Sequence, residues 1–267
     1  MKKVCFRRGK ASLAAFMVTL FCVGASAVAL PVGKKDSSAD LLQKWYKEYM
    51  ITGNTDSVAV TDAGDEFVEQ ASANLGGLLY SSLGYKNTPT GYRAVYRTGG
   101  IGYRAYKNFG GNRVNGFVTA LHVFDGAINS NAYLNRNGQY VKFGRVDAKS
   151  SAIDTAFVSI ASGNSLKTTT PSGKTITAKV AAVKRDQKVT MHGAINGEKS
   201  SEVLLPNEGG FVWTKNIISV DGDSGSIVYT NINGQNQIVG IVKGISSSST
   251  VIIKAATINS KLGVTPY

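Results

Sequence analysis

From Gly91 to its end, the chain alternates short runs of β-branched and aromatic residues with turn-forming residues, and this alternation limits the fold more than any other feature. The turns are marked by one Gly-Gly pair and three Asn-Gly pairs, at 110–111, 137–138, 196–197 and 233–234. Asn-Gly between alternating apolar runs is the strongest short signal of a two-residue β-hairpin. Helical periodicity is almost absent before about the last dozen residues. The pattern therefore predicts an all-β protein with one short C-terminal helix.

A polar stretch rich in Ser, Thr and Gly, residues 162–174, divides this β region into two halves. Short strands joined by hairpins, in two halves linked by a polar segment, are typical of paired β-barrels. We therefore predict one domain over 91–267 made of two antiparallel β-barrels, the first over about 91–161 and the second over about 175–267. A chain of 267 residues holds one such domain and leaves residues for an N-terminal segment.

The first 27 residues carry five basic and no acidic side chains, with an apolar run over 11–23 and the small-residue sequence Ala25-Ser26-Ala27 at their end. This order is that of a secretory signal peptide and its cleavage site. We predict cleavage after Ala27 and a secreted, extracellular protein with no stable membrane association afterwards. The near-apolar run over 11–30 spans about 20 residues, which is also long enough for a retained membrane anchor.

The cysteine and histidine counts exclude several kinds of site. Both cysteines, Cys5 and Cys22, lie in the leader, so the mature chain has neither a thiol nor a disulfide. Cysteine catalysis and zinc–cysteine sites are thereby excluded. The whole chain has two histidines, which excludes a multi-histidine metal site. We expect no metal ion and no cofactor.

Residues 28–90 differ in charge from the part that follows. They hold five basic and eight acidic residues, whereas 91–267 hold twenty basic and nine acidic residues. Apolar residues at helical spacing, among them Leu41, Trp45 and Tyr49, predict a helix over about 38–50. The opposite charges favour an intramolecular pro-segment over 28–90 that shields or assists the basic body. An ordinary N-terminal extension is the alternative.

Three segments of the β region carry residues suited to catalysis. His122 ends the apolar run 116–121, Asp154 precedes the alternating run 155–158, and Ser224 lies in the turn 221–226. Each of them alone is most simply a structural or turn residue. Together they are the base, the carboxylate and the nucleophile that acyl transfer by a serine requires. The first two fall in the first half and the serine in the second, so a cleft between two barrels would assemble them.

Other residues compete for the roles of carboxylate and base. Asp125 follows His122 too closely to reach behind its ring easily, and Asp147 lacks the alternating strand that follows Asp154. His192 lies at the apparent end of a strand in the second half, and we expect a surface or structural role for it. Asp154 and His122 are therefore the preferred pair.

Glycines flank the serine in the sequence Gly222-Asp223-Ser224-Gly225. An oxyanion hole needs backbone N–H groups a few residues apart in a strained turn. Gly222 has access to positive φ angles, which would direct its N–H inward beside that of Ser224. We predict these two N–H groups as the oxyanion donors. Gly225 would let the chain leave the turn without covering the nucleophile.

These segments resemble the trypsin-like serine proteases of chymotrypsin fold, and in particular the secreted bacterial streptogrisin-like group. The resemblance runs over about 91–267 and includes the chain order His, Asp, Ser and the ending 258–264. It implies an endopeptidase with its active site in the cleft between the barrels, acting on peptide or protein substrates through an acyl-enzyme intermediate. It implies His122 as general base, Asp154 as its orienting group and Ser224 as nucleophile. Many members have an N-terminal pro-segment, and we expect a monomer.

The sequence departs from that family at several positions. Val123 stands where the family has a cysteine whose disulfide braces the loop, and Lys243 where it has a serine near the aspartate. Ile245 replaces a glycine that keeps the specificity pocket open, and Ile218 stands at the pocket base. The segment Lys243-Gly244-Ile245 resembles the edge that pairs with the substrate backbone. We therefore predict that Ile218 and 243–245 bind substrate and favour an apolar residue on the acyl side of the cut bond. A Lys243 ammonium directed into the pocket would instead favour an acidic residue.

An exported, non-catalytic binding protein on a protease-like fold is the alternative function. Its basic body would dock to an anionic polymer or an acidic partner. The presence of His122, Asp154, Ser224 and both glycines argues against it, because a binding protein has no chemical need for this combination. Nucleic acid is not an expected partner.

Overall fold

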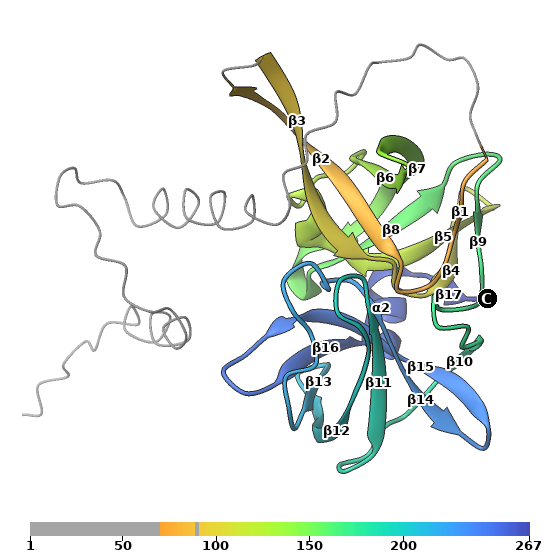
Figure 1. Ribbon diagram of the computed structural model, residues 1–267. Helices are drawn as coiled ribbons and strands as arrows, with labels where there is room; N and C mark the ends of the chain where they lie inside the picture. Colours follow the sequence, from red (N-terminus) through yellow and green to blue (C-terminus); the bar gives the residue numbers. More distant parts are fainter. Residues whose placement is uncertain (1–69, 89–90) are drawn as a thin grey trace, which may run out of the picture. The chain divides into compact units, whose positions relative to one another are not determined.

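The computed structural model of the protein describes residues 70–88 and 91–267 (Figure 1). The predicted signal peptide over 1–27 and the predicted helix over 38–50 lie outside the described residues. Within the described part, no helix is long and apolar enough to cross a membrane.

The first barrel is an eight-stranded antiparallel sheet. In spatial order its strands are β17 (Thr265–Pro266), β4 (Arg104–Phe109), β5 (Asn112–Ala120), β8 (Thr155–Ile160), β7 (Gln139–Ser150), β6 (Asn131–Arg136), β2 (Leu78–Thr88) and β3 (Gly91–Gly100). The sheet curls so that the end of β3 reaches β5, where Thr119 Oγ1 donates to the carbonyl of Gly100 at 2.8 Å. The N–H of Gly102 then donates to the carbonyl of Val118 at 3.0 Å.

The second barrel is closed by hydrogen bonding. Its strands in spatial order are β10 (Ile176–Val180), β15 (Gln235–Ile245), β14 (Ile227–Ile232), β11 (Lys188–Gly193), β12 (Gly197–Glu208), β13 (Phe211–Thr214) and β16 (Thr250–Lys254). β16 also pairs with β15, which closes six antiparallel strands into a barrel, while β10 joins β15 in parallel from outside. The predicted all-β fold with two antiparallel barrels is confirmed.

The turn signals form hairpins because their residues accept positive φ. Asn137 and Gly138 between β6 and β7 have φ of 52° and 87°, and Asn233 and Gly234 between β14 and β15 have φ of 51° and 79°. Positive φ at both central residues is what a type I′ hairpin turn requires. The pairs at 110–111 and 196–197 likewise join β4 to β5 and β11 to β12.

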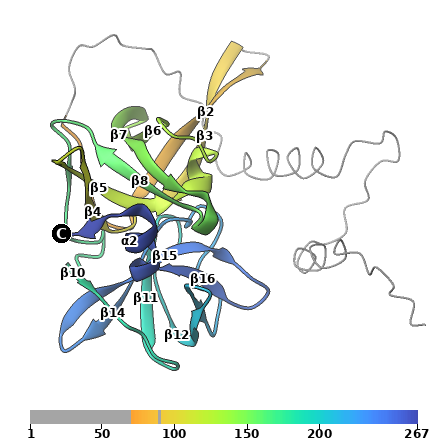
Figure 2. The ribbon, with the colours of Figure 1, turned by 180° about the vertical axis from the view of Figure 1, so that it is seen from behind.

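The chain crosses back to the first barrel at its C-terminus. The helix α2 (Ala255–Leu262) follows β16 and ends at Gly263, whose φ is 61°. Its buried residues Ile258 and Leu262 belong to the same apolar cluster as Phe117 and Phe157 of the first barrel. β17 then pairs with β4 (Figure 2). The predicted C-terminal helix is thus confirmed, and it packs into the apolar cluster that holds the core of the first barrel.

The predicted domain boundary after residue 90 requires a correction. β2 lies before it, yet it pairs with both β3 and β6. Still earlier, β1 (Ser72–Ala73) pairs in parallel with β9 (Ser165–Leu166), and Ala71 and Leu75 are buried. Residues 71–88 therefore belong to the folded body together with 91–267. All eight acidic residues of 28–90 lie at or before Glu69, so residues 71–88 share the basic character of the part that follows.

Candidate active site

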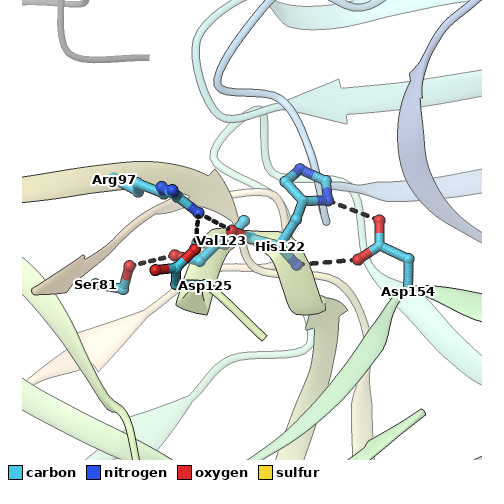
Figure 3. Close-up of polar contacts among 6 residues, drawn as sticks. All are labelled: Ser81, Arg97, His122, Val123, Asp125 and Asp154. Atoms are coloured by element: carbon cyan, nitrogen blue, oxygen red, sulfur yellow. Dashed lines mark hydrogen bonds and ion pairs between the residues drawn. The ribbon is translucent and has the colours of Figure 1, made fainter. Parts of the chain in front are cut away.

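His122 lies where β5 of the first barrel runs into η1 (Leu121–Phe124), a single turn of 3₁₀ helix. Its Nδ1 is 2.7 Å from Asp154 Oδ2, and its backbone N–H donates to Asp154 Oδ1 at 3.0 Å (Figure 3). A carboxylate only accepts hydrogen bonds, so Nδ1 carries the proton and Nε2 of the neutral ring remains an acceptor. Both side chains stay partly accessible, with 22% and 25% of their surfaces exposed. The pair is oriented for proton transfer at Nε2.

Asp154 owes its position to a short turn before β8. It ends η2 (Ser151–Ile153) in the left-handed region, with φ 55° and ψ 50°, which an aspartate tolerates better than most residues. Its carbonyl accepts a hydrogen bond from the N–H of Leu121 at 3.1 Å, which ties this turn to the start of η1. Main chain and side chain of Asp154 thus both contact the histidine turn.

The two competing carboxylates have other partners. Asp125 Oδ1 is 3.1 Å from Nη1 of Arg97, and Asp147 Oδ1 is 2.8 Å from Nε of Arg145. Of the three carboxylates that the sequence offered, Asp154 alone contacts His122 among the residues that the structure describes.

Ser224 lies in a turn of the second barrel that packs against the histidine turn of the first. Its carbonyl accepts a hydrogen bond from Gly100 N–H at 2.7 Å. A Cβ added to Gly99 would lie 3.0 Å from that carbonyl and 2.5 Å from Cγ2 of Val123, the residue after His122. A Cβ on Gly225 would lie 2.1 Å from Thr119 Oγ1 in β5. The absence of side chains at these two glycines therefore lets the serine turn approach the histidine turn.

No hydrogen bond joins Ser224 Oγ to His122 in the described residues. Such contacts are often long in the absence of substrate and tighten when it binds. The structure therefore shows Ser224 in a turn that packs against the first barrel, without a hydrogen bond between its hydroxyl and His122.

Asp223 fixes the shape of the serine turn. Its side chain is fully buried, Oδ1 accepts from the N–H groups of Ile195 and Asn196 at 2.8 and 3.2 Å, and Oδ2 accepts from Val220 N–H at 3.0 Å. A buried carboxylate is tolerated because these hydrogen bonds satisfy it. Sequence reasoning assigned it no role, although it stands inside the Gly-Asp-Ser-Gly motif.

The predicted oxyanion donors are available in this turn. Gly222 has φ 92°, the positive value that the sequence led us to expect. Among the described residues, neither the Gly222 N–H nor the Ser224 N–H donates a hydrogen bond. Two backbone donors two residues apart are thus left for a ligand oxygen.

The predicted substrate-binding residues fall in different surroundings. Ile218 is 6% exposed and belongs to the core cluster of the second barrel, while its N–H donates to Thr250 Oγ1 at 2.9 Å. Lys243 is exposed, and its ammonium lies 4.8 Å from the ring centre of Phe211. Gly244 follows at a shift in the pairing of β15 with β16, and Ile245 is 46% exposed. The structure thus keeps Lys243 and Ile245 at the surface and Ile218 in the core.

Sequence reasoning missed an apolar surface beside the serine turn. Ile195, Ile217 and Val220 are 53%, 46% and 41% exposed, which is unusual for large apolar side chains. Ile195 borders the serine turn directly, since a Cβ on Gly222 would lie 2.8 Å from its Cγ1. Ile195 lies within the turn between β11 and β12, and a lone isoleucine before Asn-Gly gives no local signal of such a role.

His192 lies apart from the Asp154 pair, at the end of β11. It is 6% exposed, and its Nδ1 is 3.5 Å from Ser172 Oγ. Burial lowers the pKa of its ring below the ordinary 6.5, and the charges of Glu198 and Asp223 partly oppose this. The described residues hold no group of three or more side chains that could ligate a metal ion.

Solved structures show what this fold is. Thermobifida fusca Protease A matches with a TM-score of 0.54 at 17% identity, over 73% of this chain and 98% of that chain. Nocardiopsis Protease matches with a TM-score of 0.52 at 19% identity, over 73% of this chain and 99% of that chain. A glutamic acid specific serine protease, described as using a histidine triad in substrate binding, matches with 0.52 at 20% identity, over 73% and 100%. All are bacterial chymotrypsin-fold serine proteases, so the chain has the chymotrypsin fold.

No model of a known protein family matches the sequence, and no curated protein does.

Proposed function

We propose that this protein is a serine endopeptidase in which Ser224 is the nucleophile, His122 the general base and Asp154 its orienting carboxylate. The observation that carries the proposal is the 2.7 Å contact between His122 Nδ1 and Asp154 Oδ2 beside the turn that holds Ser224. The pair comes from one barrel and the serine from the other, as a catalytic site in the cleft of this fold needs. The chymotrypsin fold of the similar proteases supports the same reading at the level of fold.

In the proposed mechanism, one of these residues acts at each step of peptide hydrolysis. Ser224 Oγ attacks the carbonyl carbon of the peptide bond while its proton passes to Nε2 of His122. Asp154 stabilises the imidazolium that results, and the N–H groups of Gly222 and Ser224 donate to the oxygen that becomes negative. His122 then gives the proton to the leaving amine, which departs and leaves an acyl-enzyme. Water, deprotonated by the same histidine, hydrolyses the ester and restores Ser224.

We also propose that substrates present apolar residues to this site. The exposed Ile195, Val220 and Ile245 offer apolar contact area, and Lys243 extends over Phe211. A histidine triad like that described for the glutamic acid specific protease is not available here, because the chain has only His122 and His192. Cleavage after acidic residues would therefore need a different cation. Gly244 and its neighbours at the end of β15 are proposed to pair with the substrate backbone.

Export and maturation belong to the same proposal. Residues 1–27 would direct the protein out of the cell, and the segment between Ala27 and the folded body would be an intramolecular pro-segment. Its acidic residues, all at or before Glu69, oppose the basic charge of the body. The mature enzyme would act on peptides and proteins as a monomer, without a cofactor.

Kinetics of single variants test the triad. Ser224→Ala and His122→Ala should each lower kcat by several orders of magnitude, leaving the rate that the oxyanion hole and binding alone provide. Ser260→Ala, an exposed serine in α2, is the matched control and should leave kcat unchanged. Peptide hydrolysis that survived both active-site substitutions would exclude the mechanism, and a purified protein without any hydrolysis would favour a binding function.

A further inference from the structure

The peptide groups on both sides of His122 are held by charged side chains. The backbone N–H of His122 donates to Asp154 Oδ1 at 3.0 Å, and Nη1 of Arg97 donates to the backbone carbonyl of His122 at 2.9 Å (Figure 3). Arg97 comes from β3 and its side chain is 3% exposed, so a buried guanidinium contacts the histidine turn. The same Nη1 is 3.1 Å from Asp125 Oδ1 at the end of that turn.

A second contact from the neighbouring strand supports the same turn. Ser81 Oγ in β2 donates to the carbonyl of Val123, and both groups are buried (Figure 3). Gly99 lies against the Val123 side chain, where a Cβ would come within 2.5 Å of it. Two adjacent strands therefore brace the turn here through hydrogen bonds.

The turn depends on such a brace. A 3₁₀ helix of four residues has little stability of its own, and η1 has no side-chain cap at its start. A hydrogen bond from an ionised donor is roughly twice as strong as one between neutral groups, and more so when it is buried. Asp125 is 65% exposed, so its ion pair with Arg97 contributes little. Of these two contacts, the one with the His122 carbonyl is therefore the stronger.

We propose that Arg97 is a positioning residue for the general base: its buried guanidinium holds the His122 carbonyl and keeps the imidazole aligned with Asp154 and Ser224. The inference rests on the proposed function of His122. It assigns no contact between Arg97 and the substrate or the reacting atoms.

Four variants of the full chain separate this role from general stability. Arg97→Met removes the guanidinium and keeps the apolar stem, while Arg97→Lys keeps the charge with a single donor group. Asp125→Asn removes the exposed ion pair and keeps the carbonyl contact. Arg145→Met is the matched control, because Arg145 is an arginine of the same barrel, 53% exposed and paired with Asp147. Circular dichroism and thermal unfolding first establish that each variant is folded.

The kinetic result expected is a change in kcat with little change in KM. A displacement of about 1 Å in a catalytic group costs up to about 100-fold, so Arg97→Met should lower kcat by about 10- to 100-fold. Arg97→Lys should recover part of that loss. KM should stay within about threefold of the parent, since substrate contacts are untouched. Asp125→Asn and Arg145→Met should leave kcat within about threefold.

A spectroscopic measurement tests the same role without catalysis. The Nδ1 proton between His122 and Asp154 should give a proton resonance far downfield, assigned by its loss in Asp154→Asn. In the Ser224→Ala background, Arg97→Met should shift this resonance upfield or broaden it, whereas Arg145→Met should not. If Arg97→Met does not fold, the same measurement on Arg97→Lys tests the role, and we expect a smaller upfield shift or broadening of the Nδ1 resonance.

The outcomes distinguish this inference from the proposed function. Unchanged kcat and an unchanged resonance in folded Arg97→Met or Arg97→Lys would overturn the role of Arg97 while leaving the triad intact. Equal losses in Arg97→Met and Arg145→Met would overturn it as well. Hydrolysis that persists in Ser224→Ala would overturn the proposed function instead, and the resonance would still report whether Arg97 aligns the pair.

Discussion

Among single residues, the proposed mechanism depends on which ring nitrogen of His122 carries the proton. Asp154→Asn replaces an acceptor with an amide that also donates, so the ring would hold its proton on Nε2 and could not act as a base. The expected loss in kcat is on the order of 10⁴-fold. The measurement is hydrolysis of a peptide substrate at saturating concentration.

Asp147→Asn is the matched control for that substitution, because Asp147 is a partly buried aspartate of the same barrel that pairs with Arg145. It should change kcat by less than about threefold. A similar loss in both variants, or a loss below tenfold in Asp154→Asn, would contradict the assignment of the carboxylate.

His192 gives a prediction about stability rather than activity. Burial holds its pKa below the ordinary 6.5, so on acidification the unfolded chain takes up this proton before the folded one does. The stability that the neutral ring contributes is present above about pH 6.5 and is lost as the pH falls through the lower pKa of the folded state. His192→Gln should therefore lose less stability between pH 7.5 and pH 5 than the parent.

Denaturant unfolding at both pH values measures this difference. Other groups titrate over the same range in both proteins, so the comparison is between the two changes in free energy of unfolding. Equal changes in parent and variant would show that His192 does not contribute to the pH dependence.

At the scale of elements, the contact between the serine turn and β5 depends on one glycine. Gly225 has φ 86°, and a Cβ there would lie 2.1 Å from Thr119 Oγ1 and 2.8 Å from Ala120 N. Gly225→Ala should destabilise the fold by about 2–5 kcal/mol, combining backbone strain with overpacking. It should also lower kcat, because the turn is displaced from the histidine.

Gly234→Ala provides the comparison for backbone strain alone. Gly234 has φ 79° in the hairpin between β14 and β15, and a Cβ there would meet nothing within 4 Å. Gly234→Ala should lower the free energy of unfolding by about 1–2 kcal/mol and leave kcat unchanged. Thermal unfolding and kcat are the two readouts, and equal effects of the two substitutions on kcat would contradict the packing argument.

Elements encoded by neighbouring residues could be predicted from the sequence, and those that depend on distant contacts could not. The Asn-Gly hairpins were predictable because their φ angles are a local requirement. β2 was missed because its pairing with β6 is long-range and its own pattern is interrupted at Gly84. Ile218 was assigned to the pocket base from the resemblance, and its hydrogen bond to Thr250 and its core packing depend on distant residues that the sequence does not reveal. Arg97 gave no signal, because it acts on a carbonyl 25 residues away.

At the scale of the whole molecule, the start of the folded body limits where maturation can occur. The Leu75 N–H donates to the Thr169 carbonyl at 3.0 Å, and the Ala71 N–H donates to Asn164 Oδ1 at 2.8 Å. The change from acidic to basic composition alone predicts a second cut between about Ser81 and Arg93. Such a cut would separate these buried residues and part of β2 from β3. We therefore predict a mature N-terminus at or before Ala71, following removal of the acidic segment that ends at Glu69.

N-terminal sequencing of protein recovered from the culture medium checks this position. A mature N-terminus after Leu79 on an active enzyme would contradict it, because β1 and the start of β2 would then be dispensable. Val28 as the N-terminus of an active enzyme would refute the pro-segment.

Ser224 is proposed as an activated nucleophile, and covalent labelling with a fluorophosphonate tests this activation directly. The reagent forms a stable adduct only with a serine whose hydroxyl is activated by a base beside an oxyanion hole. Mass spectrometry of the digested protein should place a single adduct on Ser224, and His122→Ala should abolish it while Ser260→Ala retains it. An unlabelled folded protein, or an adduct on another residue, would contradict the account.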